Sequence, residues 1–186
     1  MKDILVEAVK LNKNKGSSTA VLASLEEPNV MKTCNLGDSG YAIFRASVGE
    51  DSKMILTKTF RSEEQQYRFN FPYQCGTGCE LPYKAHDNQH EVSAGKDFVV
   101  MGTDGLFDNL FDHDIHNCLH PSVRPLKDSK EEFELVEPES VAKCMANKAY
   151  SLSKDRRYMS PFAKGAVKTG NRYFGGKEDD ITVIVS

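Results

Sequence analysis

The stretch Asp97-Phe-Val-Val-Met-Gly-Thr-Asp-Gly-Leu-Phe-Asp108 decides how the chain is organised, because it joins a strand to a helix through one acidic residue. Its apolar run, residues 98–101, is short and bounded by glycines, which predicts a strand that is buried on both faces. After Gly105, apolar residues recur at helical spacing as far as Ile115, which predicts a helix over this segment. We therefore expect Asp104 to lie at the carboxyl end of a buried strand.

Asp104 has two interpretations. It could be a turn residue or an N-cap, since an aspartate accepts hydrogen bonds well from the backbone N–H groups of a helix's first turn. It could instead be a ligand for Mg²⁺ or Mn²⁺, because an ionised carboxylate at the end of a rigid element suits a hard cation. The local sequence leaves both interpretations open.

Two further segments also place carboxylates at the ends of strands. Asp38 lies in a Gly-Asp-Ser-Gly turn between two strand-like runs, and Asp179 and Asp180 immediately precede a β-branched run. Each Gly-Asp turn by itself could be an ordinary turn between two secondary-structure elements. Taken together, these acids occupy positions that a sheet can bring close to one another. We predict that the carboxylates of Asp38, Asp104 and Asp179 converge.

In this order, the three segments resemble the metal-dependent protein phosphatases of the 2C type. Residues 100–108 resemble the family's Ser/Thr-Asp-Gly motif, and residues 179–183 resemble its closing Asp-Asn-x-Thr motif. Residues 16–20 resemble the small-residue segment that enters a strand ahead of the Gly-Asp-Ser turn. Residues 64–74 and 158–163 resemble the subgroup that includes a mitochondrial phosphatase of animals and chloroplast phosphatases of plants.

The fold class expected from both arguments is α+β. Strands in two groups with helices covering them predict an α+β sandwich from the pattern alone. The resemblance implies a four-layer sandwich of two antiparallel β-sheets covered by antiparallel helices, here without the family's N-terminal strands. We expect residues 1–186 to form a single, N-terminally incomplete catalytic domain.

The resemblance also implies an activity, a serine/threonine protein phosphatase that hydrolyses phosphoserine and phosphothreonine with a water activated by two Mg²⁺ or Mn²⁺ ions. Asp104 and Asp179 match carboxylates that bind the first metal. Asp38 matches an acid that, with Asp104, can hold a third and weaker ion. Asp180 stands where the family usually has Asn, which leaves open which of the two adjacent acids binds; we favour Asp179.

The chain departs from the family at its beginning. The family's phosphate-binding Arg and its Asp-Gly segment, whose carboxylate bridges the two metals, both precede the region that residues 16–20 resemble. The 186 residues contain no Asp-Gly-x-Gly-Gly sequence. We therefore expect the carboxyl-terminal part of a catalytic domain, inactive as it stands. The alternative is a non-catalytic, phosphatase-like module that binds partner proteins.

Composition excludes several other classes. With 186 residues, of which 39% are hydrophobic, the chain can bury one core. A net charge of −3 gives no basic footprint for nucleic acid and no basic segment for a membrane surface. The resemblance implies a phosphoprotein substrate as the partner, and we expect a monomer. No membrane span or signal peptide is evident, which predicts a soluble intracellular protein. The resemblance leaves the mitochondrion and the cytoplasm both open as its compartment. The five cysteines are odd in number and scattered, which favours a reducing compartment without disulfides.

Local sequence patterns predict the remaining helices and strands. Apolar residues recur at helical spacing over residues 4–11, which predicts an amphipathic helix that ends near Gly16, and Pro138 opens a second helix. Pro161 and the glycine-rich residues 164–176 are expected to end the helical region. Four strands with short connections predict an antiparallel meander, over residues 19–25, 30–36, 41–46 and 54–57.

Overall fold

The Gly-Asp turn at residues 37–39 separates two different sheets in the computed structural model of the chain. The structure describes residues 1–26, 29–78, 82–129 and 131–186. Strand β3 (Val30–Leu36) ends before the turn and β4 (Gly40–Val48) begins after it, but the two strands do not pair. The predicted four-stranded meander is therefore wrong at this turn, because β3 pairs with β2 and β9, whereas β4 pairs with β5 in a second sheet. The chain forms two compact units, residues 1–40 with 62–92 and residues 41–61 with 93–186.

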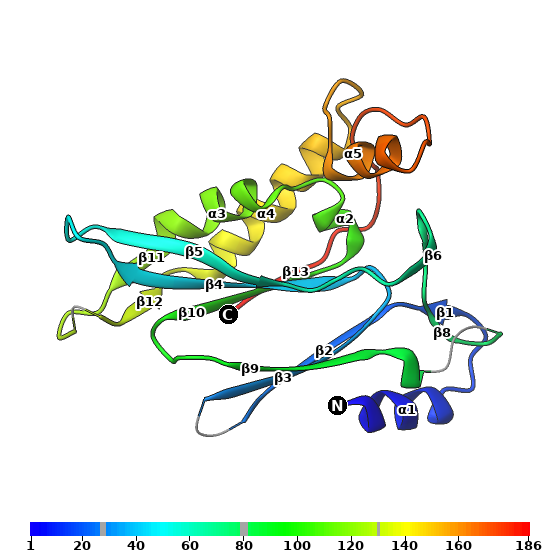
Figure 1. Cartoon of the computed structure of the whole chain (residues 1–186), viewed down its shortest axis with the longest axis horizontal. Helices are drawn as coiled ribbons and strands as arrows, with labels where there is room; N and C mark the ends of the chain where they lie inside the picture. The colour runs from blue at the N-terminus through cyan, green and yellow to red at the C-terminus, as the bar shows by residue number, and fades with distance from the viewer. Residues whose placement is uncertain (27–28, 79–81, 130) are drawn as a thin grey trace. The chain divides into compact units, whose positions relative to one another are not determined.

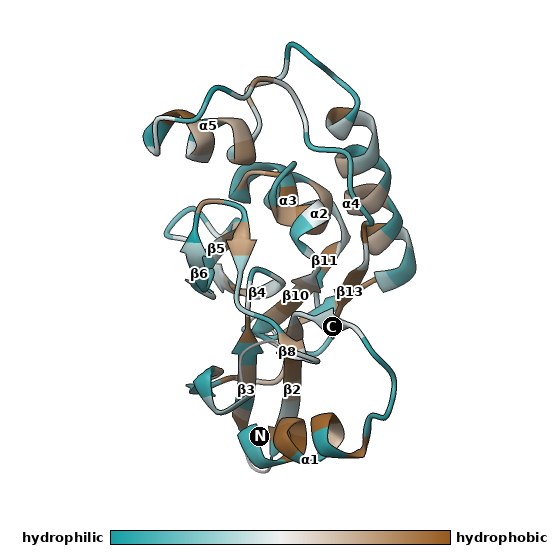
Figure 2. Ribbon diagram, turned by 90° about the vertical axis from the view of Figure 1, so that its right-hand side faces the viewer, coloured by the Kyte–Doolittle hydropathy of each residue, from teal (hydrophilic) through white to brown (hydrophobic). Residues whose placement is uncertain are grey.

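The first unit is built on a three-stranded antiparallel sheet in the order β2-β3-β9. Helix α1 (Lys2–Leu11) alternates hydrophobic and hydrophilic residues, as Figure 2 shows, and contributes Leu5 to a small core. Strand β9 was not predicted, because its sequence, His-Asp-Asn-Gln-His-Glu, is polar and it forms through its backbone pairing with β3. The other elements of this unit are β1 (Ser17–Ser18), β2 (Ala20–Glu26), β6 (Gln66–Arg68), β7 (Phe71–Pro72), β8 (Cys75–Gly76), η1 (Pro82–Lys84) and β9 (His86–Glu91).

The second unit is built on a four-stranded sheet in the order β13-β10-β4-β5. Within this unit, helices α3 and α4 lie beside each other, and the chain returns at its carboxyl end to pair β13 with β10 in antiparallel fashion (Figure 1). Its strands are β4, β5 (Met54–Arg61), β10 (Asp97–Gly102), β11 (Val123–Pro125), β12 (Phe133–Leu135) and β13 (Val183–Val185). Its helices are α2 (Asp104–Phe107), α3 (Asp112–Leu119), η2 (His120–Ser122), α4 (Pro138–Ser153) and α5 (Pro161–Lys168). Helices and antiparallel sheets together confirm the α+β class.

The core of the second unit lies against one face of β10. Phe98 and Val100 are buried, whereas Val99 and Met101 on the other face are half-buried. The predicted strand is confirmed, but the expectation that both faces are buried is wrong for the face of Val99 and Met101, because the apolar run hides the alternation between the faces. The covering helix α4 buries one stripe at helical spacing, Val141, Met145 and Ala149.

The helical segments differ from the prediction in two places. The single helix expected after Gly105 is divided into α2 and α3, because the Asp114 carboxylate accepts the backbone N–H of Phe111 at 3.0 Å and caps a new helix there. Pro161 begins α5 instead of ending the helical region. Proline is well tolerated at the first helical position, and the hydroxyl of Ser160 accepts the N–H of Ala163 at 3.1 Å as the N-cap.

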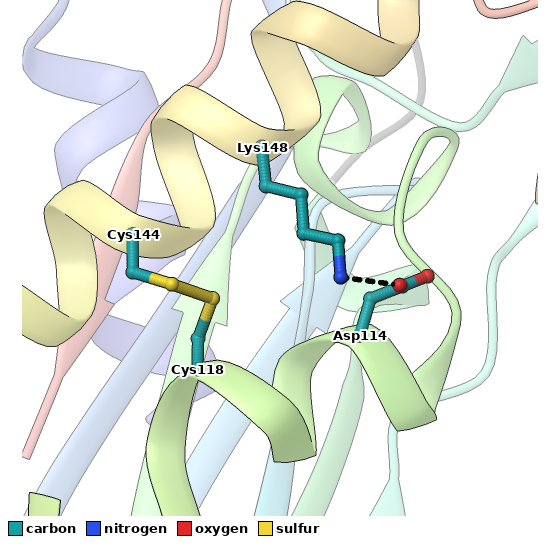
Figure 3. The surroundings of a disulfide bond; sticks show 4 residues. All are labelled: Asp114, Cys118, Cys144 and Lys148. Atoms are coloured by element: carbon teal, nitrogen blue, oxygen red, sulfur yellow. Dashed lines mark ion pairs between the residues drawn. A yellow bond between two sulfur atoms is a disulfide. The ribbon is translucent and has the colours of Figure 1, made fainter. Parts of the chain in front are cut away.

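A disulfide between Cys118 and Cys144 joins α3 to α4 (Figure 3). One turn away along each helix, the Lys148 ammonium and the Asp114 carboxylate form an ion pair at 2.7 Å. The expectation of a chain without disulfides is therefore wrong, because two cysteines 26 residues apart meet only once the two helices are packed. Cys34 and Cys75 are free and buried, and Cys79 lies outside the described residues.

Within the described part of the chain, every helix is too short or too polar to cross a membrane.

Candidate metal centre

Asp104 is positioned by the end of β10 and the start of α2. Thr103 fixes this junction, because its hydroxyl donates to the carbonyl of Asp180 at 2.8 Å and accepts the N–H of Thr182 at 3.0 Å. The backbone N–H of Thr103 also donates to the carbonyl of Thr182 at 3.2 Å. The segment that enters β13 is thereby held against the residue before Asp104. Two motifs that are distant in the sequence thus become neighbours.

The glycine after Asp104 is required by this close approach. A Cβ atom at Gly105 would lie 2.4 Å from the carbonyl oxygen of Asp180, which is a separation that real Cβ atoms do not tolerate. The Asp-Gly pair therefore serves packing between α2 and the segment before β13. The Asp104 side chain itself has two roles, since Oδ1 accepts the N–H of Gly105 at 2.9 Å and Oδ2 accepts a hydrogen bond from Lys177. The Asp104 carboxylate thus makes a local turn contact and binds an ammonium group, and its role as a ligand for Mg²⁺ or Mn²⁺ stays a prediction.

Three carboxylates surround the ammonium group of Lys177. Its Nζ lies 2.7 Å from Oδ2 of Asp104, 2.7 Å from Oδ2 of Asp108 and 3.1 Å from Oδ2 of Asp179. Only 15% of the Lys177 side chain is exposed, and the Asp108 side chain is 14% exposed. Burial by itself would lower the pKa of Lys177, but the charges of Asp108 and Asp104 offset this effect and raise the pKa above its ordinary value. Lys177 is therefore a fully charged cation.

A buried asparagine holds the backbone of Lys177 in place. The side-chain amide of Asn109 donates to the carbonyl of Lys177 at 2.8 Å, and its oxygen accepts the Lys177 N–H at 2.9 Å. The same amide nitrogen donates to the carbonyl of Gly105 at 2.9 Å. Asn109 has no exposed surface. It therefore fixes the segment that carries Lys177 and Asp179 relative to α2.

The donor set agrees in chemistry with a hard cation. Asp104 and Asp179 both direct a carboxylate oxygen at one positively charged centre, and oxygen ligands are those that Mg²⁺ and Mn²⁺ prefer. In the described part of the chain, however, no three His, Cys, Asp or Glu side chains are spaced to ligate one metal ion directly. The spacing of the carboxylates is set by the ammonium group of Lys177. The carboxylates of Asp104 and Asp179 are ligands of the type that a metal ion needs, but they are arranged around the ammonium group of Lys177.

The other predicted acids are placed differently. Asp180 is exposed and makes hydrogen bonds through its backbone, because its carbonyl accepts from the Thr103 hydroxyl and its N–H donates to the Asp179 carboxylate. Asp38 is half-buried in the first unit, in the turn that follows β3. Its convergence with Asp104 and Asp179 stays a prediction.

The turn of Asp38 is well defined within the first unit. The buried side chain of Gln65 accepts the N–H of Gly37 at 3.1 Å, and the N–H of Gln65 donates to the carbonyl of Gly37 at 2.9 Å. A Cβ atom at Gly37 would lie 2.5 Å from the carbonyl oxygen of Tyr73 and from a methyl carbon of Thr19. Only glycine fits this position.

Sequence reasoning missed Lys177, Asp108 and Asn109. Two signals could have indicated the first two. Asp108 follows Asp104 by four residues, which is the spacing of one helical face, and Lys177 precedes Asp179 by two residues, which is the spacing of one side of an extended segment. Asn109 gave no such signal, because its role depends on a backbone that approaches from 68 residues away.

The chain is similar to proteins that are named as protein phosphatases. The chain is 36% identical over 185 residues to "Probable protein phosphatase 2C 80" of Arabidopsis thaliana, which covers 98% of the chain and 40% of that protein. It is 37% identical over 181 residues to "Protein phosphatase PTC7 homolog" of Xenopus laevis, which covers 92% of the chain and 55% of that protein. The chain thus spans about half or less of the length of these curated relatives. No protein-family model matches it.

A solved structure shows the same fold. The photosystem II phosphatase PBCP superposes with a TM-score of 0.78 at 27% sequence identity, over 99% of this chain and 69% of that one. The helices and antiparallel sheets described above therefore follow an arrangement already observed by X-ray crystallography.

Proposed function

Because the chain belongs to the protein phosphatase 2C family, we propose that it is part of a metal-dependent serine/threonine protein phosphatase that acts on phosphoproteins. The observation that carries the proposal is that Asp104 and Asp179 lie close enough to contact one ammonium group, that of Lys177. These two acids belong to the two motifs whose order in the sequence resembles the family. The two compact units together would form its single catalytic domain.

Asp104 and Asp179 would hold the first metal of the site. Mg²⁺ or Mn²⁺ bound there would supply a Lewis acid that activates water and offsets the charge developing on a phosphoryl group. The chain's own residues prepare this position, since Thr103 ties the two motifs together and Asn109 fixes the segment that carries Asp179. Asp38 is proposed as a further ligand. The contact of Asp179 with Lys177, whose ammonium group also contacts Asp104, supports Asp179 as the ligand of the adjacent pair.

A second candidate function is a phosphatase-like module that binds phosphoproteins without hydrolysing them. One observation favours it, since the ammonium group of Lys177 occupies the position among the carboxylates where a metal would be bound.

Mn²⁺ binding to the 186-residue chain tests the proposed centre. We expect weak binding in isothermal titration calorimetry, abolished by Asp104→Asn, because this variant removes the negative charge from the central ligand. Asp51→Asn is the matched control, since Asp51 is exposed in the turn between β4 and β5. Binding that survives Asp104→Asn would contradict the metal centre.

Phosphopeptide turnover separates the two candidate functions. We expect the 186-residue chain alone to show no Mn²⁺-dependent hydrolysis of a phosphothreonine peptide. Robust hydrolysis that is lost in Asp104→Asn would establish the enzyme and overturn the expected inactivity of this chain. Binding of the same peptide in the absence of Mn²⁺, measured by fluorescence anisotropy, would instead favour the binding module.

A further inference from the structure

We propose that Lys177 is an intramolecular competitor for the metal, whose ammonium group must leave the carboxylates of Asp104 and Asp179 before a divalent cation binds them. This inference rests on the proposed metal centre and assigns to it a built-in control of metal affinity. It starts from the position of Nζ, which lies within 3.1 Å of an oxygen of each carboxylate.

The two cations would use the same ligand atoms. Oδ2 of Asp104 and Oδ2 of Asp179 are the atoms that approach Nζ most closely, and a divalent metal needs such oxygens at about 2.0 to 2.6 Å. An ammonium group and a divalent ion at this spacing would repel each other strongly inside a partly buried site. Occupation by Lys177 and occupation by a metal therefore exclude each other.

The structure also offers the displaced ammonium group another partner. Asp108 contacts Nζ at 2.7 Å, and it is not one of the acids assigned to the metal. The backbone of Lys177 is clamped by Asn109, so only the flexible four-carbon side chain needs to move. We expect Lys177 to keep its contact with Asp108 while it releases the other two carboxylates. Asp108 would then lower the cost of displacement but not remove it.

The strength of the hydrogen bonds between Lys177 and the carboxylates determines by how much Lys177 weakens metal binding. Hydrogen bonds between charged groups are about twice as strong as those between neutral groups, and those of Lys177 are largely shielded from water. Releasing two such contacts should weaken metal binding by about tenfold or more compared with a chain that lacks the ammonium group. The metal affinity of the natural sequence is therefore lower than its carboxylates alone would give.

The variant Lys177→Met tests the proposal, because it keeps an unbranched side chain of similar length and removes the charge. We expect the affinity for Mn²⁺ in titration calorimetry to rise by about tenfold or more. We also expect Mn²⁺ to raise the melting temperature of this variant by more than that of the natural sequence. Lys143→Met is the matched control, since Lys143 is exposed on α4 and pairs there with Glu139, and it should bind Mn²⁺ like the natural sequence.

The outcomes distinguish this inference from the proposed function. If the natural sequence binds Mn²⁺ through Asp104 and Lys177→Met binds it equally or more weakly, the competitor role is overturned and the metal centre stands. If neither chain binds Mn²⁺ in a way that depends on Asp104, the metal centre itself fails. Should Lys177→Met not fold, Lys177→Gln replaces it, because glutamine is neutral and keeps a hydrogen-bond donor. A higher Mn²⁺ affinity in Lys177→Gln supports the proposal, and an unchanged or lower affinity overturns it.

Discussion

Replacing Asn109 by alanine should destabilise the second unit, because one buried side chain makes three hydrogen bonds there. Its amide donates to the carbonyls of Gly105 and Lys177, and its oxygen accepts the Lys177 N–H, all at 2.8 to 2.9 Å. Each such bond contributes about 1 kcal/mol net, so Asn109→Ala should lower the free energy of unfolding by about 3 kcal/mol. The loss is large because alanine leaves the backbone groups of Lys177 without the partners they have in the folded chain.

Urea unfolding followed by circular dichroism measures this change. Asn109→Asp is a second, nearly isosteric variant that keeps the acceptor for the Lys177 N–H but loses both donors, so it should be destabilised at least as much as the alanine variant. Asn171→Ala is the control, since Asn171 is exposed and its side-chain amide donates to the hydroxyl of Thr169, two residues away. Its effect should stay within about 0.5 kcal/mol.

Hydrogen exchange at the Lys177 amide gives a local readout of the same clamp. We expect this amide to exchange faster in Asn109→Ala than in the natural sequence, because its acceptor is gone. If the alanine variant is as stable as the natural sequence and this amide is equally protected, the clamp does not hold the segment. The reasoning about Asn109 would then be refuted.

Two further predictions concern the helical layer of the second unit. Replacing both Cys118 and Cys144 by serine should lower the free energy of unfolding in urea by about 3.5 kcal/mol, because the cross-link closes a 26-residue separation in the unfolded chain; an unchanged midpoint would contradict this. Burial, with the charge of Asp114, raises the pKa of Tyr158 from 10.0 to about 12. The folded chain therefore keeps this proton to a higher pH than the unfolded chain does. The free energy of unfolding should fall as the pH rises from 10 to about 12. The Tyr158 hydroxyl has no hydrogen-bond partner among the described residues, so Tyr158→Phe should not reduce stability at neutral pH and should weaken the alkaline loss in thermal unfolding; an identical pH profile would contradict the prediction.

Local patterns in the sequence were sufficient to locate the main elements. The run of residues 98–101 predicted β10, and the apolar spacing after Pro138 predicted α4 with its buried stripe. These predictions hold because strand and helix periodicities depend only on neighbours along the chain. The predicted helix boundaries were wrong where a single capping contact decides them, as at Phe111 and Asp114 between α2 and α3. Strand β9 was not predicted for a related reason, since its pairing with β3 gives no signal in its own side chains.

The sequence by itself determined the family, the α+β class and the two motifs that carry Asp104 and Asp179. Tertiary structure alone decided what surrounds these acids. It brought Lys177 to Asp108 across 69 positions and joined Cys118 to Cys144 across 26. The physical reason is that propensity and periodicity act over a few residues, whereas the partner of a buried charge or thiol depends on the path of the whole backbone.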